Sequence, residues 1–390
     1  MNRADSTEKS TAWLTGAGGT AFGRHEGQGA LDLMAQAAQQ ALQDAGLKRT
    51  DIDGLLCGYA TTLPHLMLST LFCERFSLDP SYAHSLQVGG ATGAAMLMLA
   101  RELVRSGRCR NVLVVAGENR LSGQSRDSAI QTLAQVGDPD YEVPNGASVP
   151  AYYGLMASRY LHETGTTEAD LADFAVLMRA NAARHPGAHL TAPITVADVL
   201  ASKPIAAPLK LMDCCPISDG AMALVVSAAP GDRPCVAMTG AGQAHKHQHL
   251  SAMADVMQCG AGVAAQRAFA DAGLGVADID HLGIYDSFTI TLTMLLEEIG
   301  FAPRGGAARR LRNGDFSAGG ALPLNTHGGL LSFGHSGVAG GMAHAVEVFR
   351  QMTGQAGVRQ VAKPRHAFVH ADGGVMSSHV SLILSQEPLQ

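Results

Sequence analysis

Histidine and cysteine are the residues in this sequence that first suggest a metal site or a nucleophile. The densest histidine group is HKHQH, in which His245, His247 and His249 are spaced two residues apart. On a β-strand these side chains would share one face and could bind a metal, whereas in a loop they would form a solvated polar segment. We favour the loop, and we predict no metal site.

Two neighbouring cysteines, Cys214 and Cys215, stand directly before a proline. They could supply a nucleophile or a pair of metal ligands, but their spacing fits neither a CxxC site nor a second cysteine pair. We therefore predict that they lead into a buried strand. The seven cysteines are odd in number and scattered through apolar segments, which is typical of reduced thiols in a cytoplasmic protein.

Glycine-rich stretches separate the apolar segments of the chain at 16–23, 89–93 and 328–341. The first, GAGGTAFG, has some of the composition of a dinucleotide-binding loop. Its GxGxxG order is broken, however, and no acidic residue closes a second strand about 20 residues later, so we predict no dinucleotide cofactor. We instead expect these stretches to be tight turns from strands into helices, where glycine is tolerant of positive φ.

The composition sets limits on the class of protein. The chain has 390 residues, of which 46% are hydrophobic and 16% charged, so it can bury a large core in about two to three units. Its formal net charge of −6 argues against nucleic-acid binding, which needs a surplus of Lys and Arg. No apolar stretch approaches the roughly 18 residues of a membrane span, and the polar first ten residues lack the apolar centre of a signal peptide.

The elements that must position any site follow from the hydrophobic pattern. Short, continuously apolar segments predict strands covered on both faces at 111–118, 222–229 and 380–385. Apolar residues at helical spacing predict helices at 31–45 and 92–106, and a further helix is expected at 264–272. Alternating strands and helices indicate an α/β protein.

An internal repeat divides the chain into two related halves. Residues 41–55, ALQDAGLKRTDIDGL, match residues 268–282, AFADAGLGVADIDHL, at nine positions with an offset of about 227. A helix, a glycine cap, an acidic turn and a strand start thus occur twice, which indicates two copies of one α/β unit rather than a solenoid.

The region between the two copies differs in composition. From about 122 to 208 it is rich in proline, with helix-like segments at 151–163 and 168–184, and we expect an inserted loop or lid. The predicted division is a first half at 11–229, containing that insertion, and a second half at 234–390.

With these features the chain resembles the thiolase superfamily, and in particular its sterol-carrier and lipid-transfer branch. The resemblance covers nearly the whole chain and is carried by TGAGGTAFGR (15–24), GGATGAAMLMLARELV (89–104), VLVVAGENRL (112–121), PLKLMDCCPISDGAMALVV (208–226), GIYDSFTITLTMLLEEIGF (283–301), LPLNTHGGLLSFGHSGVAGG (322–341) and VHADGGVMSS (369–378). It implies a thiolase fold with five α-β-α-β-α layers, a coenzyme A thioester as substrate and no covalently bound cofactor. It also implies a homodimer paired through the sheet edge of the first half.

One departure from the family pattern dominates. The family places its nucleophilic cysteine where this sequence has Gly90, followed by Ala91, and the second family cysteine has no obvious counterpart in HADGG at 370–374. Without a nucleophile the acyl-enzyme cannot form. Ordinary two-step thiolysis is therefore not expected.

The remaining family positions supply acid and base groups. His335, in GHSGVAGG, matches the family's Gly-His-Pro histidine, and Asn325 and His327 stand in the loop just before it. Tyr285, in IYDSF, takes a position that is often histidine in the family. The resemblance thus implies a catalytic set of two imidazoles, a phenol and an amide.

Glycine loops of the family contact the substrate. By resemblance we expect Gly90, Ala91, Gly334, Gly373 and Gly374 to line the substrate site. Backbone N–H groups at the start of the 92–106 helix would stabilise an enolate or oxyanion.

This set suits retro-aldol or aldol chemistry on an acyl-CoA in lipid metabolism, which needs a base and a stabilised enolate but no acyl-enzyme. Cysteine-free members of the branch are similar to aldolases that work with a small OB-fold, zinc-containing partner protein, although those carry tyrosine where this chain has His335. Two alternatives stay open: an acyltransferase that uses another nucleophile or a partner's thiol, and a non-catalytic subunit that binds acyl-CoA. The sequence leaves the acyl group and the reaction direction undetermined.

Overall fold

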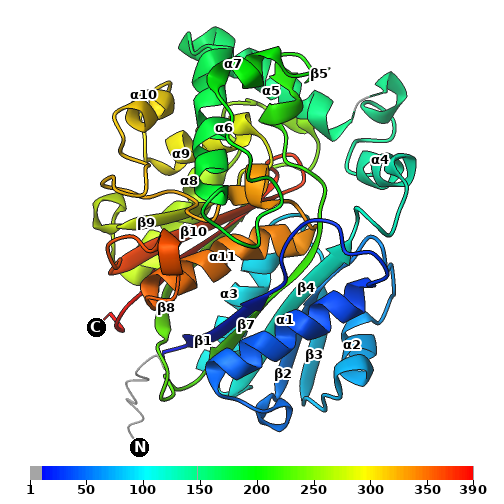
Figure 1. The fold of residues 1–390 in the computed structure, drawn as a ribbon, viewed down its shortest axis with the longest axis vertical. Helices are drawn as coiled ribbons and strands as arrows, with labels where there is room; N and C mark the ends of the chain where they lie inside the picture. The colour runs from blue at the N-terminus through cyan, green and yellow to red at the C-terminus, as the bar shows by residue number, and fades with distance from the viewer. Residues whose placement is uncertain (1–10, 147, 390) are drawn as a thin grey trace, which may run out of the picture.

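The computed structural model describes residues 11–146 and 148–389 (Figure 1). Its centre is a nine-stranded sheet in the order β3-β2-β4-β7-β1-β8-β11-β10-β9, with helices on its faces. The predicted α/β class is confirmed. Among the described residues, no helix has the length and apolar character needed to cross a membrane.

The first half supplies five neighbouring strands of this sheet. They are β1 (Trp13–Gly19), β2 (Gly54–Gly58), β3 (Tyr82–Leu86), β4 (Asn111–Asn119) and β7 (Asp219–Ser227), with helices α1 (Ala30–Ala45), α2 (Leu68–Phe76) and α3 (Thr92–Arg105). Strand β2 is parallel to β3 and β4, and β7 is antiparallel to β4 and β1. The helices predicted at 31–45 and 92–106 are α1 and α3.

The second half supplies the other four strands. They are β8 (Val236–His245), β9 (His281–Ile284), β10 (His366–Gly373) and β11 (Ser378–Ser385), with α8 (Ala261–Ala272), α9 (Thr289–Ile299), α10 (Ala307–Arg312) and α11 (Val338–Met352). Strands β1 and β8 join the halves through two antiparallel residue pairs, Trp13 with Ala237 and Leu14 with Val236. The chain passes from one half to the other between Ser227 and Val236.

Helices α3 and α11 form the middle layer of the molecule. Each contacts strands of both halves as well as the other helix, whereas α1 covers the outer face of the first half and α8 that of the second (Figure 1). This gives the five α-β-α-β-α layers expected from the resemblance. Because both central helices start at the same end of the buried layer, their N-terminal loops are brought together.

The internal repeat has the same structure in both copies. Gly46 ends α1 with φ 72°, and Gly273 ends α8 with φ 67°, which is a left-handed conformation that favours glycine. Asp53 accepts the backbone N–H at the start of β4 at 2.9 Å, and Asp280 accepts the one at the start of β10 at 3.1 Å. The repeated acidic residues therefore fix the same strand start twice.

The first glycine-rich stretch differs from the prediction. We expected 16–23 to be a turn into a helix, but β1 runs through it to Gly19. A Cβ at Gly16 would lie 2.6 Å from the backbone nitrogen of Ala45, and one at Gly18 would lie 2.5 Å from that of Ala41. These glycines let α1 approach the strand closely, which is a packing reason rather than a turn.

The inserted region contains α4 (Arg126–Ala134), α5 (Val149–Thr164), α6 (Glu168–Ala182), α7 (Val196–Ala201), β5 (Pro204–Ala206) and β6 (Leu209–Lys210). Helix α6 packs on α9, α10 and the π-helical turn Gly329–Phe333 of the second half, while α4 lies on a separate arm (Figure 1). The insertion thus covers the loop that carries His327 and His335.

Candidate active site

The predicted glycine loops meet at one end of the central helix layer. A Cβ at Gly89 would lie 2.7 Å from the backbone nitrogen of Gly374, and one at Gly373 would lie 3.2 Å from that of Ala91. The start of α3 and the end of β10 are therefore in direct contact. Gly334, in contrast, packs against Ser218.

Tyr285 and His335 form a hydrogen-bonded pair beside these loops. The Tyr285 hydroxyl lies 2.9 Å from His335 Nε2. The backbone on both sides of His335 is fixed, because its N–H donates to Pro216 and its carbonyl accepts from Ser218. Tyr285 is 4% exposed, and His335 is half-buried as a residue, although its Nδ1 is buried without a hydrogen-bond partner.

The phenol of Tyr285 occupies the space that a side chain at position 90 would need. A Cβ at Gly90 would overlap the Tyr285 hydroxyl, would lie 2.6 Å from its Cζ and 2.5 Å from the carbonyl oxygen of Asp372. A cysteine at position 90 is thus incompatible with this position of Tyr285. The glycine at position 90 and the position of the Tyr285 phenol therefore depend on each other.

The pair is neutral at physiological pH. Burial raises the pKa of Tyr285 well above its ordinary value, and the nearby Asp372 raises it further. Burial and then the charge of Arg120 lower the pKa of His335 to about 3. A protonated phenol therefore faces a neutral imidazole that can accept a proton.

Asn325 holds the segment that carries Tyr285. Its Oδ1 accepts the backbone N–H of Ile284 at 2.8 Å, and its Nδ2 donates to the Ile284 carbonyl at 2.7 Å. Its φ of 45° lies in the left-handed region. Because both amide atoms are bonded to the backbone, the contacts are those of a residue that positions Tyr285.

His327 lies away from the Tyr285–His335 pair, in a row of buried imidazoles. Its ring is 4.9 Å from that of His344, and neither of its nitrogens has a hydrogen-bond partner in the structure. Burial, and then the neighbouring His335, lower the pKa of His344 to about 3. His344 Nε2 is 3.4 Å from Asp286 Oδ1, whose pKa burial raises well above its ordinary value. His327 thus contacts the Tyr285–His335 pair only indirectly, through the ring of His344.

Asp372 is an acid that sequence analysis missed, although it stands in the HADGG motif. It is 1% exposed, and its Oδ2 accepts the Tyr153 hydroxyl at 3.3 Å while Oδ1 has no partner. Burial raises its pKa to about 8. The second-cysteine region of the family pattern thus carries a carboxyl group in this chain.

The adjacent cysteines lie in the loop that leads into β7, as predicted. Cys215 donates its backbone N–H to Ser287 and is half-buried, and burial raises the pKa of its thiol. The thiol is close enough to raise the pKa of Tyr285. A thiol that is protonated at neutral pH is a weak nucleophile.

The histidines of HKHQH contact three different groups. His245 Nδ1 pairs with Ser378 at 2.9 Å, His247 Nε2 with the Val375 carbonyl at 3.2 Å, and His249 Nδ1 lies 3.5 Å from Asp138. Within residues 11–146 and 148–389, no three His, Cys, Asp or Glu side chains are placed to hold a metal ion.

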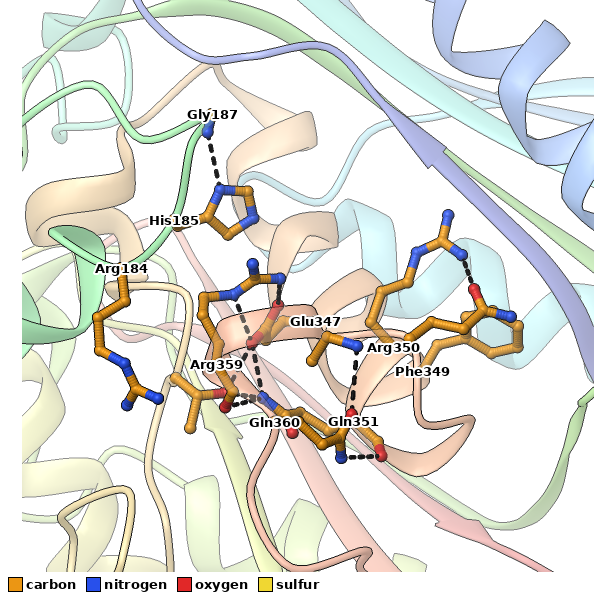
Figure 2. A network of polar contacts seen from close by, with 12 residues as sticks. Arg184, His185, Gly187, Glu347, Phe349, Arg350, Gln351, Arg359 and Gln360 are labelled. Carbon is orange, nitrogen blue, oxygen red and sulfur yellow. Dashed lines mark hydrogen bonds and ion pairs between the residues drawn. The ribbon is translucent and has the colours of Figure 1, made fainter.

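A buried ion pair anchors the loop that carries Asn325 and His327 to α11. Thr326 donates to Glu347 Oε1 at 2.8 Å, and Glu347 Oε2 pairs with Arg359 at 2.9 Å. Gln351 donates to the Arg359 carbonyl at 2.9 Å, and Figure 2 shows Glu347, Gln351 and Arg359 in one network. The network fixes the backbone on which the site is built.

The buried histidines predict a pH dependence of stability that one substitution isolates. His281, in β9, is fully buried beside Thr326, and burial lowers its pKa to about 4. Its contribution is complete above about pH 6.5 and is lost as pH falls towards 4, because the unfolded chain then binds the extra proton. His281→Gln should reduce the slope of unfolding free energy against pH by about 1.4 kcal/mol per pH unit in that window. Urea unfolding between pH 4 and 7 measures it, and an unchanged slope would contradict the burial of a neutral ring.

Comparisons with known proteins agree with this fold. The family model "Thiolase, N-terminal domain" matches residues 13–229, and "Thiolase C-terminal domain-like" matches residues 242–386. The chain therefore belongs to the thiolase superfamily.

Relatives place it within that superfamily. The 17-hydroxy-3-oxo-4-pregnene-20-carboxyl-CoA lyase of Mycobacterium tuberculosis is 32% identical over 95% of this chain and 98% of its own length. An acetyl-CoA acetyltransferase of Methanothermobacter thermautotrophicus is 31% identical over 93% and 96%. Sterol carrier protein 2 of Bos taurus is 24% identical over 94% of this chain and 70% of its own. The solved structure of an Ltp2-ChsH2(DUF35) aldolase has a TM-score of 0.83 and 31% identity, covering 96% of this chain and 98% of that chain. These matches agree with the sterol-carrier branch.

Proposed function

We propose that this protein breaks or forms a carbon–carbon bond of an acyl-CoA thioester by retro-aldol or aldol chemistry, without a covalent acyl-enzyme. The observation that carries the proposal is the Tyr285 hydroxyl, which lies in the space of the absent nucleophile and 2.9 Å from His335 Nε2. The lyase and aldolase relatives support the same reaction class.

In the cleavage direction, the Tyr285 oxygen accepts the β-hydroxyl proton of the substrate while its own proton passes to His335 Nε2. The Cα–Cβ bond then breaks, the β-carbon becomes an aldehyde or ketone, and its electron pair forms the enolate of the shortened acyl-CoA. Proton return from the imidazolium through the phenol to Cα completes the reaction.

The enolate oxygen needs hydrogen-bond donors. We propose that backbone N–H groups of Gly90, Ala91 and Gly374 supply them, since these loops pack together at the start of α3 and the helix dipole favours negative charge there. Gly373 gives the close approach of the two loops, whereas Gly334 packs against Ser218 beside His335. Asn325 positions Tyr285 through the backbone of Ile284, and His327 packs against His344.

The test is incubation of the purified protein with β-hydroxyacyl-CoAs of several chain lengths, followed by detection of released carbonyl compound and shortened acyl-CoA. Intact-protein mass spectrometry of the same samples detects any acyl adduct. Carbonyl release without an adduct is the expected result. A stable adduct would favour the acyltransferase alternative, and no release at any chain length, with or without a partner protein, would favour the non-catalytic subunit.

The proposed partner is a small OB-fold protein that contains zinc. It is supported by the solved Ltp2-ChsH2(DUF35) aldolase, one chain of which this chain matches over 96% of its own length. We further propose a role in lipid metabolism. We also propose a cytoplasmic location, because all seven cysteines are unbridged. The halves 11–229 and 234–390 remain our proposed domain division.

We also propose a homodimer. Strand β3 ends the sheet of the first half, and its His84 is exposed. Edge-to-edge pairing of β3 would satisfy its outer backbone groups. Sedimentation at micromolar concentration should give about twice 40.5 kDa.

His84→Glu should lower that mass by placing like charges across the two-fold axis, whereas the exposed His162→Glu on α5 serves as the matched control. A wild-type mass near 40 kDa would contradict the dimer.

A further inference from the structure

Arg120 carries a buried positive charge that the mechanism above does not use. It directly follows β4 and is 6% exposed. Neither Nε nor Nη2 has a hydrogen-bond partner in the structure. These two nitrogens lie on the same edge of the guanidinium, the edge that binds a carboxylate through two parallel hydrogen bonds. An unbonded buried cation is costly, so this edge is suited to an acceptor that arrives with a ligand.

The neighbouring carboxylate does not fill that edge. Glu118 Oε2 is 3.8 Å from Arg120 Nε, which is too long for a hydrogen bond. The same oxygen accepts the Thr61 hydroxyl at 2.6 Å. The other oxygen, Oε1, has no partner and packs against Gly337. Glu118 thus offers Arg120 compensating charge without hydrogen bonds.

The position of Arg120 is fixed by the turn that follows it. The backbone N–H groups of Leu121 and Ser122 both donate to Asp219 Oδ1, at 2.6 and 3.1 Å. Asp219 also accepts the backbone N–H of His25 at 2.8 Å. The main chain directly after Arg120 is therefore fixed.

Arg120 lies beside the Tyr285–His335 pair. Ser336, next to His335 in the chain, donates its hydroxyl to the Glu118 carbonyl at 3.0 Å. The charge of Arg120 is also close enough to lower the pKa of His335. In a bound acyl-CoA, the pantetheine arm separates the phosphates from the thioester. A cation next to the base therefore faces the acyl group and not the CoA phosphates.

We propose that Arg120 binds a free carboxylate on the acyl group, so that the preferred substrates are acyl-CoA thioesters with a second, carboxylic acid function. The inference rests on the proposed function and names its substrate class. The acyl carboxylate meets the Nε–Nη2 edge of Arg120, next to the carbon–carbon bond that the pair cleaves.

The experiment compares matched pairs of CoA thioesters that differ by carboxylate against methyl: succinyl with butyryl, and glutaryl with pentanoyl. Calorimetry on freshly prepared ligands should show, for at least one pair, about 30-fold tighter binding of the carboxylate form. Arg120→Gln should bring the two Kd values within about threefold of each other. Arg120→Lys, which keeps the charge but loses the two-pronged geometry, should give an intermediate ratio.

Glu118→Gln is the matched variant that keeps the shape and removes the competing charge, and it should keep or increase the preference. If the wild-type protein binds both members of every pair equally, the inference about Arg120 is overturned while the proposed function stands. Failure to bind any of the thioesters would overturn the proposed function and the inference with it. The ratio of the two Kd values for the wild-type protein tests the inference even if a variant does not fold.

Discussion

Tyr285→Phe should lower kcat for carbon–carbon cleavage by about 10³-fold, with little change in the affinity for an acyl-CoA. The substitution keeps the buried ring and removes only the oxygen that lies 2.9 Å from His335 Nε2. Positioned proton transfer contributes typically about 10² to 10⁴ in rate, and here the phenol would be the group that contacts the substrate hydroxyl. Steady-state release of the carbonyl product, together with the Kd of an unreactive acyl-CoA, measures the effect.

The pair should act as one unit. His335→Gln alone should cost about as much as Tyr285→Phe, and the double variant should lose little more, because either change interrupts the same proton transfer. Tyr160→Phe is the matched control, since its hydroxyl donates to Glu297 at 2.8 Å in another part of the molecule. Fully additive losses in the double variant would mean that the two side chains have separate roles.

The fold could be predicted from the sequence to an unusual depth because the chain contains its main unit twice. The Ala-Gly-Leu and Asp-Ile-Asp segments predict a helix end and a strand start, and Gly46 and Asp53 adopt these roles in the first copy. Local propensity and hydrophobic period decide such elements. The prediction of a turn at 16–23 was wrong because these glycines are required by the close packing of α1 on β1, which is a tertiary contact.

The candidate site could be predicted only in part, for the same reason. Family motifs led to Tyr285 and His335, but their hydrogen bond joins residues 50 positions apart. Asp372 stands in HADGG and Arg120 in VLVVAGENRL, but neither segment marks these residues as functional. Their significance comes from burial and from missing hydrogen-bond partners, which arise only in the folded chain. The relation between Gly90 and Tyr285 is a steric one across 195 positions, and a single sequence gives no sign of it.

Gly90→Ala should lower activity about as strongly as loss of the phenol, by about 10³-fold. Its Cβ would overlap the Tyr285 hydroxyl and lie 2.5 Å from the Asp372 carbonyl, so the phenol must move away from His335. Overpacking at a rigid position should also lower the unfolding free energy by about 1–3 kcal/mol. Product release and urea unfolding measure the two effects.

Gly319→Ala is the matched control, because a Cβ there has no atom within 4 Å and the backbone has no positive φ. It should leave both activity and stability close to the wild-type values. Adding Tyr285→Phe to the Gly90→Ala variant should recover part of the lost stability, since the hydroxyl is the atom that the new methyl overlaps and the buried ring is kept, while activity stays low because the proton-transferring group is gone. An active Gly90→Ala variant would instead show that the phenol can leave the space of the absent nucleophile without cost, and the link between the missing thiol and the Tyr285–His335 chemistry would be lost.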